Sequence, residues 1–106
     1  MCIFCKIIKK EIPADFLFEN GDVVAFKDIH PKSKTHILIV PKKHIETIKD
    51  LKEDEADEIL VGKMFLVARD IAKSKNLDGY QLQFNVGKLG GQEVMHIHLH
   101  LMSNQG

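Results

Sequence analysis

Three histidines alternate with aliphatic residues near the C-terminus, in the segment His96-Ile97-His98-Leu99-His100-Leu101-Met102. Successive side chains of a β-strand point to opposite faces, so the alternation predicts a strand with all three imidazoles on one face. The aliphatic side chains then lie on the other face, where they can join a core. Three neighbouring imidazoles near neutral pH can serve as acid, base, nucleophile or metal ligand. The segment therefore predicts both a strand and a chemical site.

The composition indicates one globular domain over residues 1–106, long enough to bury a substantial core. Hydrophobic residues make up 44% and charged residues 28%, which is typical of a folded protein. Fifteen basic and fifteen acidic residues give a net charge of zero, so we expect no nucleic-acid duplex as a partner. No apolar run approaches the roughly 18 residues that a membrane span needs, so we expect no membrane partner.

The apolar pattern predicts two helices and five strands. Helices are expected over residues 4–10 and 50–75, and strands over 15–19, 23–26, 36–40, 80–84 and 96–102. Asn20-Gly21-Asp22 supplies the turn chemistry for an antiparallel hairpin between the first two strands. Asp50 with Glu53 resembles a capping box at the start of the long helix. This order of elements predicts an α+β domain with an antiparallel sheet.

The two cysteines, Cys2 and Cys5, lie three positions apart at the N-terminus. The first residues turn polar too soon for a signal peptide, so we expect a cytoplasmic location, where thiols stay reduced. A metal site, a redox pair and two inert thiols all share this spacing. A thioredoxin-like redox motif would need a strand before it, which the sequence does not offer. Zinc, with His44 as a third ligand, is the better hypothesis.

The histidine segment has three interpretations. It can be a solvated polar face, a site where two of the imidazoles bind zinc, or a site where a neutral imidazole attacks an electrophilic phosphorus. Gly87, Gly90 and Gly91 lie just upstream, and glycine-containing loops can aim backbone amides at an anion. Asn85 adds a neutral donor to the same loop. Together with the imidazoles, this loop favours a phosphate site.

The segment 96–102 also matches the motif of the histidine triad superfamily, in which three histidines alternate with hydrophobic residues. Gly90-Gly91-Gln92, just before it, resembles the Hint branch of that superfamily, the nucleoside phosphoramidate hydrolases. The resemblance runs over nearly the whole chain, because further segments look like Hint segments in the expected order. They are residues 2–8, 25–29 and 35–45, together with Asn85.

This resemblance implies a fold, an assembly and an activity. The expected fold is a five-stranded antiparallel sheet with one long and one short helix, and the sheet continues across a homodimer. The expected substrate is a purine nucleoside monophosphate, of adenosine by preference, that carries an amine on phosphorus. By similarity, His98 is the nucleophile and forms a nucleotidyl-histidine that water hydrolyses. His100 contacts the phosphate or leaving group, His36 orients the other histidines, and the chemistry at phosphorus requires no metal.

The resemblance also implies a substrate-binding set. Asp28 would accept hydrogen bonds from the ribose, and the residues expected around the base and phosphate are Phe26, Ile29, Asn85, Gly91, Gln92, Glu93, His98 and His100. Glu93 stands where Hint proteins usually have serine. We expect its carboxylate to point outward while its backbone amide faces the ligand.

Some prokaryotic Hint-like proteins bind a structural zinc ion, and the matching positions here are Cys2, Cys5, His44 and His96. If His96 binds the metal, catalysis rests on His98 and His100 with His36. Two other functions remain open at this point. One is hydrolysis of dinucleoside polyphosphates, as in the fragile-histidine-triad branch. The other is a nucleotide-binding regulatory scaffold whose hydrolysis is incidental.

Overall fold

The computed structural model describes residues 1–106 and has the predicted α+β architecture. Its helices are α1 (Ile3–Ile8) and α2 (Glu55–Ser74), with single 3₁₀ turns η1 (Ile48–Asp50) and η2 (Lys88–Gly90). Its strands are β1 (Phe16–Glu19), β2 (Val23–Lys27), β3 (Thr35–Pro41), β4 (Gln81–Gln83) and β5 (Leu99–Ser103). No helix is both long and apolar enough to span a membrane.

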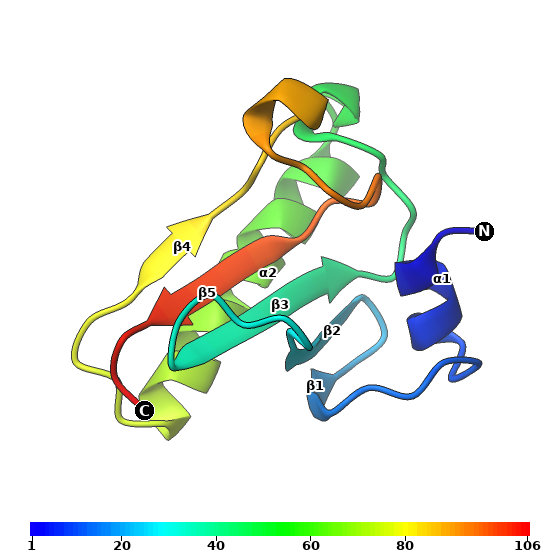
Figure 1. The fold of residues 1–106 in the computed structure, drawn as a ribbon. Helices are drawn as coiled ribbons and strands as arrows, with labels where there is room; N and C mark the ends of the chain where they lie inside the picture. Colours follow the sequence, from blue (N-terminus) through cyan, green and yellow to red (C-terminus); the bar gives the residue numbers. More distant parts are fainter.

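The five strands form one antiparallel sheet in the order β1-β2-β3-β5-β4 (Figure 1). The long helix α2 lies across one face and packs on the central strands β3 and β5. The short helix α1 lies against the opposite face, where Phe4 and Ile7 pack on Phe26 and Val40. The alternating side chains of β2 and β3 thus enter two different cores. This architecture confirms the predicted fold class.

The hairpin between β1 and β2 forms at the predicted turn. The Asn20 side chain accepts hydrogen bonds from the backbone N–H groups of Asp22 and Val23, each at 2.8 Å. A short polar side chain that binds its own backbone two residues on is what stabilises such a turn. The register then places Phe16 opposite Phe26 and Glu19 opposite Val24.

The long helix begins five residues later than its predicted start, so the prediction from residue 50 was wrong. Asp50 does belong to a capping box, but its partner is Thr47, and the box lies at the N-terminus of η1, not of α2. Asp54 caps α2 by accepting from the backbone N–H of Asp57 at 2.8 Å. Because Asp50 and Asp54 can each cap the start of a helical segment, the sequence is compatible with one long helix or with two separate segments. The apolar spacing alone does not distinguish these two possibilities.

The histidine segment is only partly a strand, which corrects its predicted extent of 96–102. β5 pairs with β3 from Leu99 onward, whereas Ile97 donates its N–H to the carbonyl of Ile45, in the loop after β3, at 2.7 Å. The predicted alternation nevertheless holds. The aliphatic side chains of residues 97, 99 and 101 are fully buried against α2. Strand β4 is likewise shorter than predicted, and Tyr80 before it is exposed.

Candidate active site and metal cluster

The imidazoles of His98 and His100 lie side by side on the face of the sheet opposite α2. Their ring centroids are 4.8 Å apart, and His36, which comes from the neighbouring strand β3, has its ring 5.1 Å from that of His100. The ring of Phe4, from α1, packs edge-on against His98 with a centroid distance of 5.0 Å. The short helix therefore supports this row of histidines from one side.

One hydrogen bond fixes the proton of His98. Its Nδ1 lies 2.8 Å from the backbone carbonyl oxygen of His96. A carbonyl oxygen can only accept, so Nδ1 carries the hydrogen and donates it. Burial lowers the pKa of His98 below its usual range, which keeps the ring neutral near pH 7. In a neutral imidazole the other nitrogen, Nε2, then has a free lone pair.

His36 and His100 form a hydrogen-bonded pair. Nε2 of His36 lies 2.8 Å from Nδ1 of His100 and 3.5 Å from a carboxylate oxygen of Asp28. Burial lowers the pKa of His36. Burial, followed by repulsion from His98 and His36, lowers the pKa of His100 to about 4. Both rings of this pair are therefore neutral near pH 7.

We expect the low pKa of His100 to make stability depend on pH. In the unfolded chain the ring takes up a proton near its usual value of 6.5, whereas in the folded protein it does so only near 4. The unfolded state thus binds more protons in between, and stability present above pH 6.5 is lost as the pH falls toward 4. Urea unfolding of wild type and His100→Asn at pH 7.5, 6 and 5 measures this. The wild type should lose more stability than the variant; parallel losses would contradict the assigned cause.

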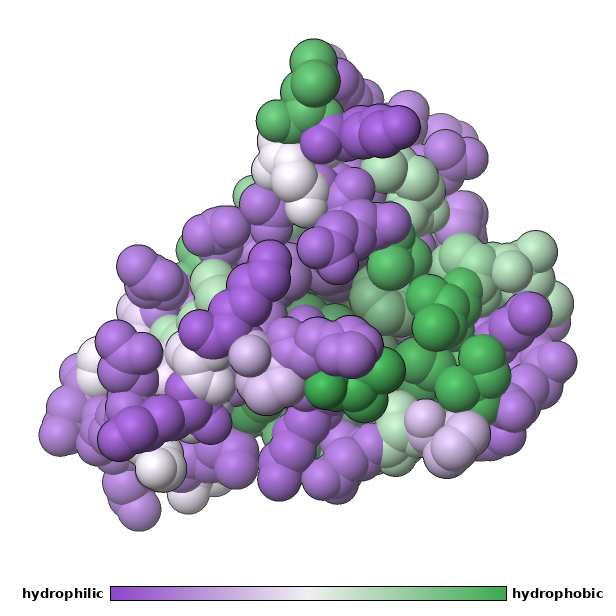
Figure 2. Space-filling model, in the orientation of Figure 1, coloured by the Kyte–Doolittle hydropathy of each residue, from purple (hydrophilic) through white to green (hydrophobic).

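A cavity of about 400 Å³, within the usual size range of small-molecule sites, opens over His98 and His100, whereas the buried His36 is not part of its lining. The predicted substrate-binding residues that line it are Asp28, Ile29, Asn85, Gly91, Glu93, His98 and His100. The sequence did not point to six others, namely Ile3, Phe4, His30, Lys32, Leu38 and Val94. Hydrophobic residues gather on the same face beside α1 (Figure 2). The cavity thus combines an apolar wall with a polar, imidazole-bearing floor.

Two predicted substrate-binding side chains do not line this cavity. Phe26 is buried behind it, and its ring packs on Phe4 at a centroid distance of 5.7 Å. Gln92 is also buried, and its amide donates to the carbonyl of Glu46 at 2.6 Å while it accepts from the N–H of Gly87 at 2.8 Å. Phe26 therefore supports the apolar wall, and Gln92 holds the glycine loop in place.

The glycine loop reaches the cavity through Asn85 and Gly91. Gly87 and Gly91 have φ angles of 72° and 87°, which side chains with a Cβ rarely adopt. The Asn85 side-chain amide donates to the carbonyl of Gly90 at 2.9 Å. Glu93 is exposed at the rim, and its negative charge acts to raise the pKa of His98, against the stronger effect of burial. The carboxylate is thus close enough to influence the site.

Four residues form a second cluster next to this cavity. Cys2 and Cys5 come from the start of α1, His44 from the loop after β3 and His96 from the segment before β5. The six distances between their two sulfur and two Nδ1 atoms all fall between 3.1 and 3.7 Å. A tetrahedral metal with bonds of about 2.0–2.3 Å would set its ligand atoms about 3.3–3.8 Å apart. The cluster therefore has the edges of a metal-binding tetrahedron.

The tautomer of His96 fits the same interpretation. Its Nε2 lies 2.8 Å from the backbone carbonyl oxygen of Pro41, so Nε2 carries the hydrogen. Its Nδ1 then has a free lone pair, and it is Nδ1 that faces the two sulfurs. A backbone carbonyl on the far nitrogen is one of the usual partners that orient a metal-binding imidazole in proteins. These four residues could hold a metal ion.

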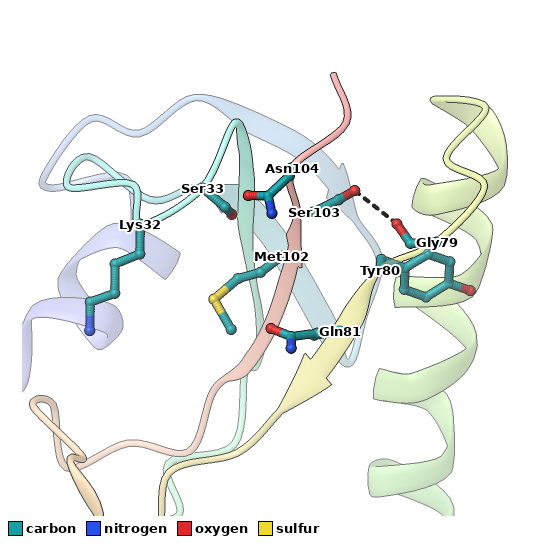
Figure 3. A pocket seen from close by; sticks show the side chains of 8 residues that line it. All are labelled: Lys32, Ser33, Gly79, Tyr80, Gln81, Met102, Ser103 and Asn104. Atoms are coloured by element: carbon teal, nitrogen blue, oxygen red, sulfur yellow. Dashed lines mark hydrogen bonds between the residues drawn. The ribbon is translucent and has the colours of Figure 1, made fainter.

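A further cavity of about 370 Å³ lies where β4 and the end of β5 meet the loop after β2 (Figure 3). Its wall includes Lys32, Gln81 and Asn104, and Ser103 donates a hydrogen bond to the carbonyl of Gly79 at 2.8 Å. It has no histidine, cysteine or carboxylate side chain in its lining. The histidine cavity is therefore the better candidate for an active site.

Comparison with known proteins agrees with this geometry. The family model described as "Scavenger mRNA decapping enzyme C-term binding" matches residues 1–106. The chain is 46% identical to Protein HitA of Neisseria gonorrhoeae over 95% of this chain and 94% of that one. It is 44% identical to the purine nucleoside phosphoramidase of Escherichia coli K12, over 97% of this chain and 87% of that one. The chain belongs to the histidine triad family.

A solved structure of a HIT family hydrolase from Legionella pneumophila has the same fold. Its TM-score is 0.93 at 46% identity, and the match covers 100% of this chain and 95% of that one. Because the match covers the whole chain, it includes the triad, helix α1 and the glycine loop. The chain is thus a histidine triad hydrolase.

Proposed function

We propose that this histidine triad protein hydrolyses purine nucleoside 5′-phosphoramidates, with adenosine as the preferred nucleoside, through a nucleotide bound covalently to His98. The observation that carries the proposal is the free lone pair on Nε2 of His98. The lone pair is free because Nδ1 of the same ring donates its hydrogen to the carbonyl of His96 at 2.8 Å. Nε2 belongs to a side chain that lines the cavity, beside His100. A buried, neutral and oriented imidazole is a competent nucleophile for phosphorus.

The reaction divides into two displacements. In the first, Nε2 of His98 bonds to phosphorus, the P–N bond breaks, and the leaving nitrogen keeps that electron pair. The nitrogen takes up one proton through His100, which regains a proton from solvent, and a neutral amine departs. In the second, water attacks the same phosphorus and loses a proton to solvent. The P–Nε2 bond breaks and its electron pair returns to His98, which yields the nucleoside monophosphate.

The rest of the cavity supports a nucleotide. Asp28 lies at its edge with one oxygen already accepting from the N–H of His30 at 2.9 Å, which holds the carboxylate in place for ribose hydroxyls. Ile29 is 78% exposed on the same loop and offers an apolar surface for a base. On the other side, the loop carrying Asn85 and Gly91 supplies donors for the phosphate.

One comparison of substrates tests the proposal. The protein is incubated with adenosine 5′-phosphoramidate and, separately, with a diadenosine polyphosphate, and the products are separated by chromatography. We expect the phosphoramidate to turn over much faster. Faster hydrolysis of the polyphosphate would favour the dinucleoside polyphosphate branch instead. Tight nucleotide binding without turnover of either substrate would favour a regulatory scaffold.

We further propose that the metal held by Cys2, Cys5, His44 and His96 is zinc with a structural role. Two thiolates and two imidazoles at tetrahedral spacing form a closed set of the structural type. The bound ion would supply a cross-link between α1 and the segment that carries His98. No step at phosphorus passes through it.

We also propose that the protein is a homodimer whose sheet continues through β4. This strand pairs only with β5, so one of its edges is open, and Ile59 and Leu66 are exposed on α2. Sedimentation should give twice the chain mass of 12.1 kDa. Leu66→Asp should shift the protein toward monomer, whereas Lys63→Asp should not, because Lys63 pairs with Asp22 near the β1–β2 turn. A monomeric wild type would contradict the proposal.

A further inference from the structure

We propose that the main-chain amide of Lys32 is a positioning group that determines which nitrogen of His100 carries the proton. This inference rests on the proposed function, because it concerns the donor that assists the leaving group. The amide lies in the loop between β2 and β3, the loop that also carries Asp28. Its N–H points at Nδ1 of His36 with a donor–acceptor distance of 3.0 Å.

The first step concerns His36. A peptide N–H can only donate, so Nδ1 of His36 must offer a lone pair. The His36 side chain is fully buried, and burial disfavours the charged form of the ring. In a neutral imidazole with a free lone pair on Nδ1, the hydrogen lies on Nε2. The oxygen of Asp28, at 3.5 Å from Nε2, favours the same placement.

The second step passes this choice to His100. The Nε2–H of His36 faces Nδ1 of His100 at 2.8 Å, so Nδ1 must accept. The neutral ring of His100 then carries its hydrogen on Nε2. This nitrogen has no hydrogen-bond partner within the protein, and the side chain lines the cavity. The cavity thus contains a bare nitrogen on His98 and an N–H on His100, in neighbouring rings.

The opposite tautomers of these two rings have different origins. The carbonyl of His96 holds the hydrogen of His98 on Nδ1, away from the cavity. The amide of Lys32, acting through His36, places the hydrogen of His100 on Nε2, toward the cavity. The same chain of bonds opposes an additional proton. A hydrogen on Nδ1 of His36 would place two N–H donors opposite each other at Lys32, which is unfavourable. A hydrogen on Nδ1 of His100 would do the same opposite the Nε2–H of His36.

A set of three chains isolates the N–H of residue 32. Lys32→Ala keeps the amide and removes the side chain, which itself lines the cavity. Lys32→Pro removes the N–H. The Lys32→Ala chain with lactic acid at position 32, made by ligation, replaces only the N–H by an ester oxygen and serves if the proline variant does not fold. Long-range ¹H–¹⁵N spectra of the imidazoles report the tautomers directly, whether or not a substrate is present.

We expect wild type and Lys32→Ala to show Nε2–H and a bare Nδ1 at both His36 and His100. The ester chain should show a mixture of tautomers at both rings. For an alkylamine phosphoramidate, kcat of the ester chain should fall about tenfold relative to Lys32→Ala, the effect of losing one hydrogen bond, with KM little changed. For the 4-nitrophenyl ester of the same nucleotide, whose leaving group needs no proton, kcat should fall less than about twofold.

Two results would overturn the inference. One is a set of spectra in which the ester chain and Lys32→Ala have the same tautomers. The other is an equal loss of kcat on both substrates, which would indicate a general disturbance of the site. Absence of phosphoramidate turnover in the wild type is a different result, because it would contradict the proposed function while the spectra would still decide the tautomers.

Discussion

Replacement of His98 by alanine is expected to reduce phosphoramidate turnover by about 10³-fold or more, equivalent to ~4 kcal/mol of transition-state stabilisation. The physical reason is that the hydrogen bond from Nδ1 to the carbonyl of His96 leaves the Nε2 lone pair of His98 free, on a side chain that lines the cavity, and alanine removes this nucleophile. Steady-state kinetics with adenosine 5′-phosphoramidate measure the loss. Quenched reactions should also lack the nucleotidyl adduct.

His30→Ala provides a matched control, because the same substitution is made on an exposed histidine that lines the same cavity. We expect this variant to stay within a few-fold of wild type. Adenosine monophosphate binding by His98→Ala separates lost chemistry from a lost fold, since removal of the ring leaves a gap beside Phe4. Turnover by His98→Ala at the wild-type rate would exclude His98 as the nucleophile.

Replacement of Cys5 by serine is expected to have the largest effect on stability. Protein purified without chelator should contain about one zinc ion per chain, and Cys5→Ser should lose it together with several kcal/mol of stability, because binding energy at a closed site is folding energy. Metal analysis and thermal unfolding measure the two effects. In the wild type a strong chelator should lower Tm, and added zinc should restore it.

Lys6→Ser is the control for this substitution, because it introduces serine at the adjacent position of α1, where the side chain is exposed. It should keep both the metal and the Tm. A wild-type protein that contains no zinc and whose Tm does not respond to chelator or added zinc would rule out the metal site. The four ligand atoms would then form only a hydrogen-bonded cluster.

The alternation of histidines and aliphatic residues was a reliable guide because it reflects a local rule of strand geometry. Ile97, Leu99 and Leu101 enter the core under α2 whether or not their backbone pairs as a regular strand. The limits of the strand followed from long-range pairing instead. Ile97 pairs with Ile45, beyond the end of β3, and no local pattern encodes that partner.

The start of α2 was harder to predict because Asp50 and Asp54 are both competent caps. Each satisfies backbone N–H groups at the start of a helical turn. The choice between one helix and two depends on how the residues between them pack, since isolated turns of helix are only marginally stable. Sequence spacing alone therefore merged η1 and α2.

The candidate site was predictable where side-chain type carries the chemistry, as for His98 and His100. It was not predictable where the backbone acts, as at Lys32, because every residue except proline offers the same N–H. Phe26 and Gln92 show a third case, since both lie directly behind the cavity and support it. Only the packing of the folded chain separates a residue that lines a cavity from one that lies behind it.

The stereochemical course at phosphorus is the most direct test of a covalent bond between His98 and the nucleotide. The wild-type protein is given a nucleoside phosphoramidate that is chiral at phosphorus through a sulfur substitution, and hydrolysis is run in ¹⁸O-labelled water. Two in-line displacements, one by His98 and one by water, each invert the configuration, so we expect net retention. Net inversion would show a single direct attack by water and would contradict a covalent role for His98.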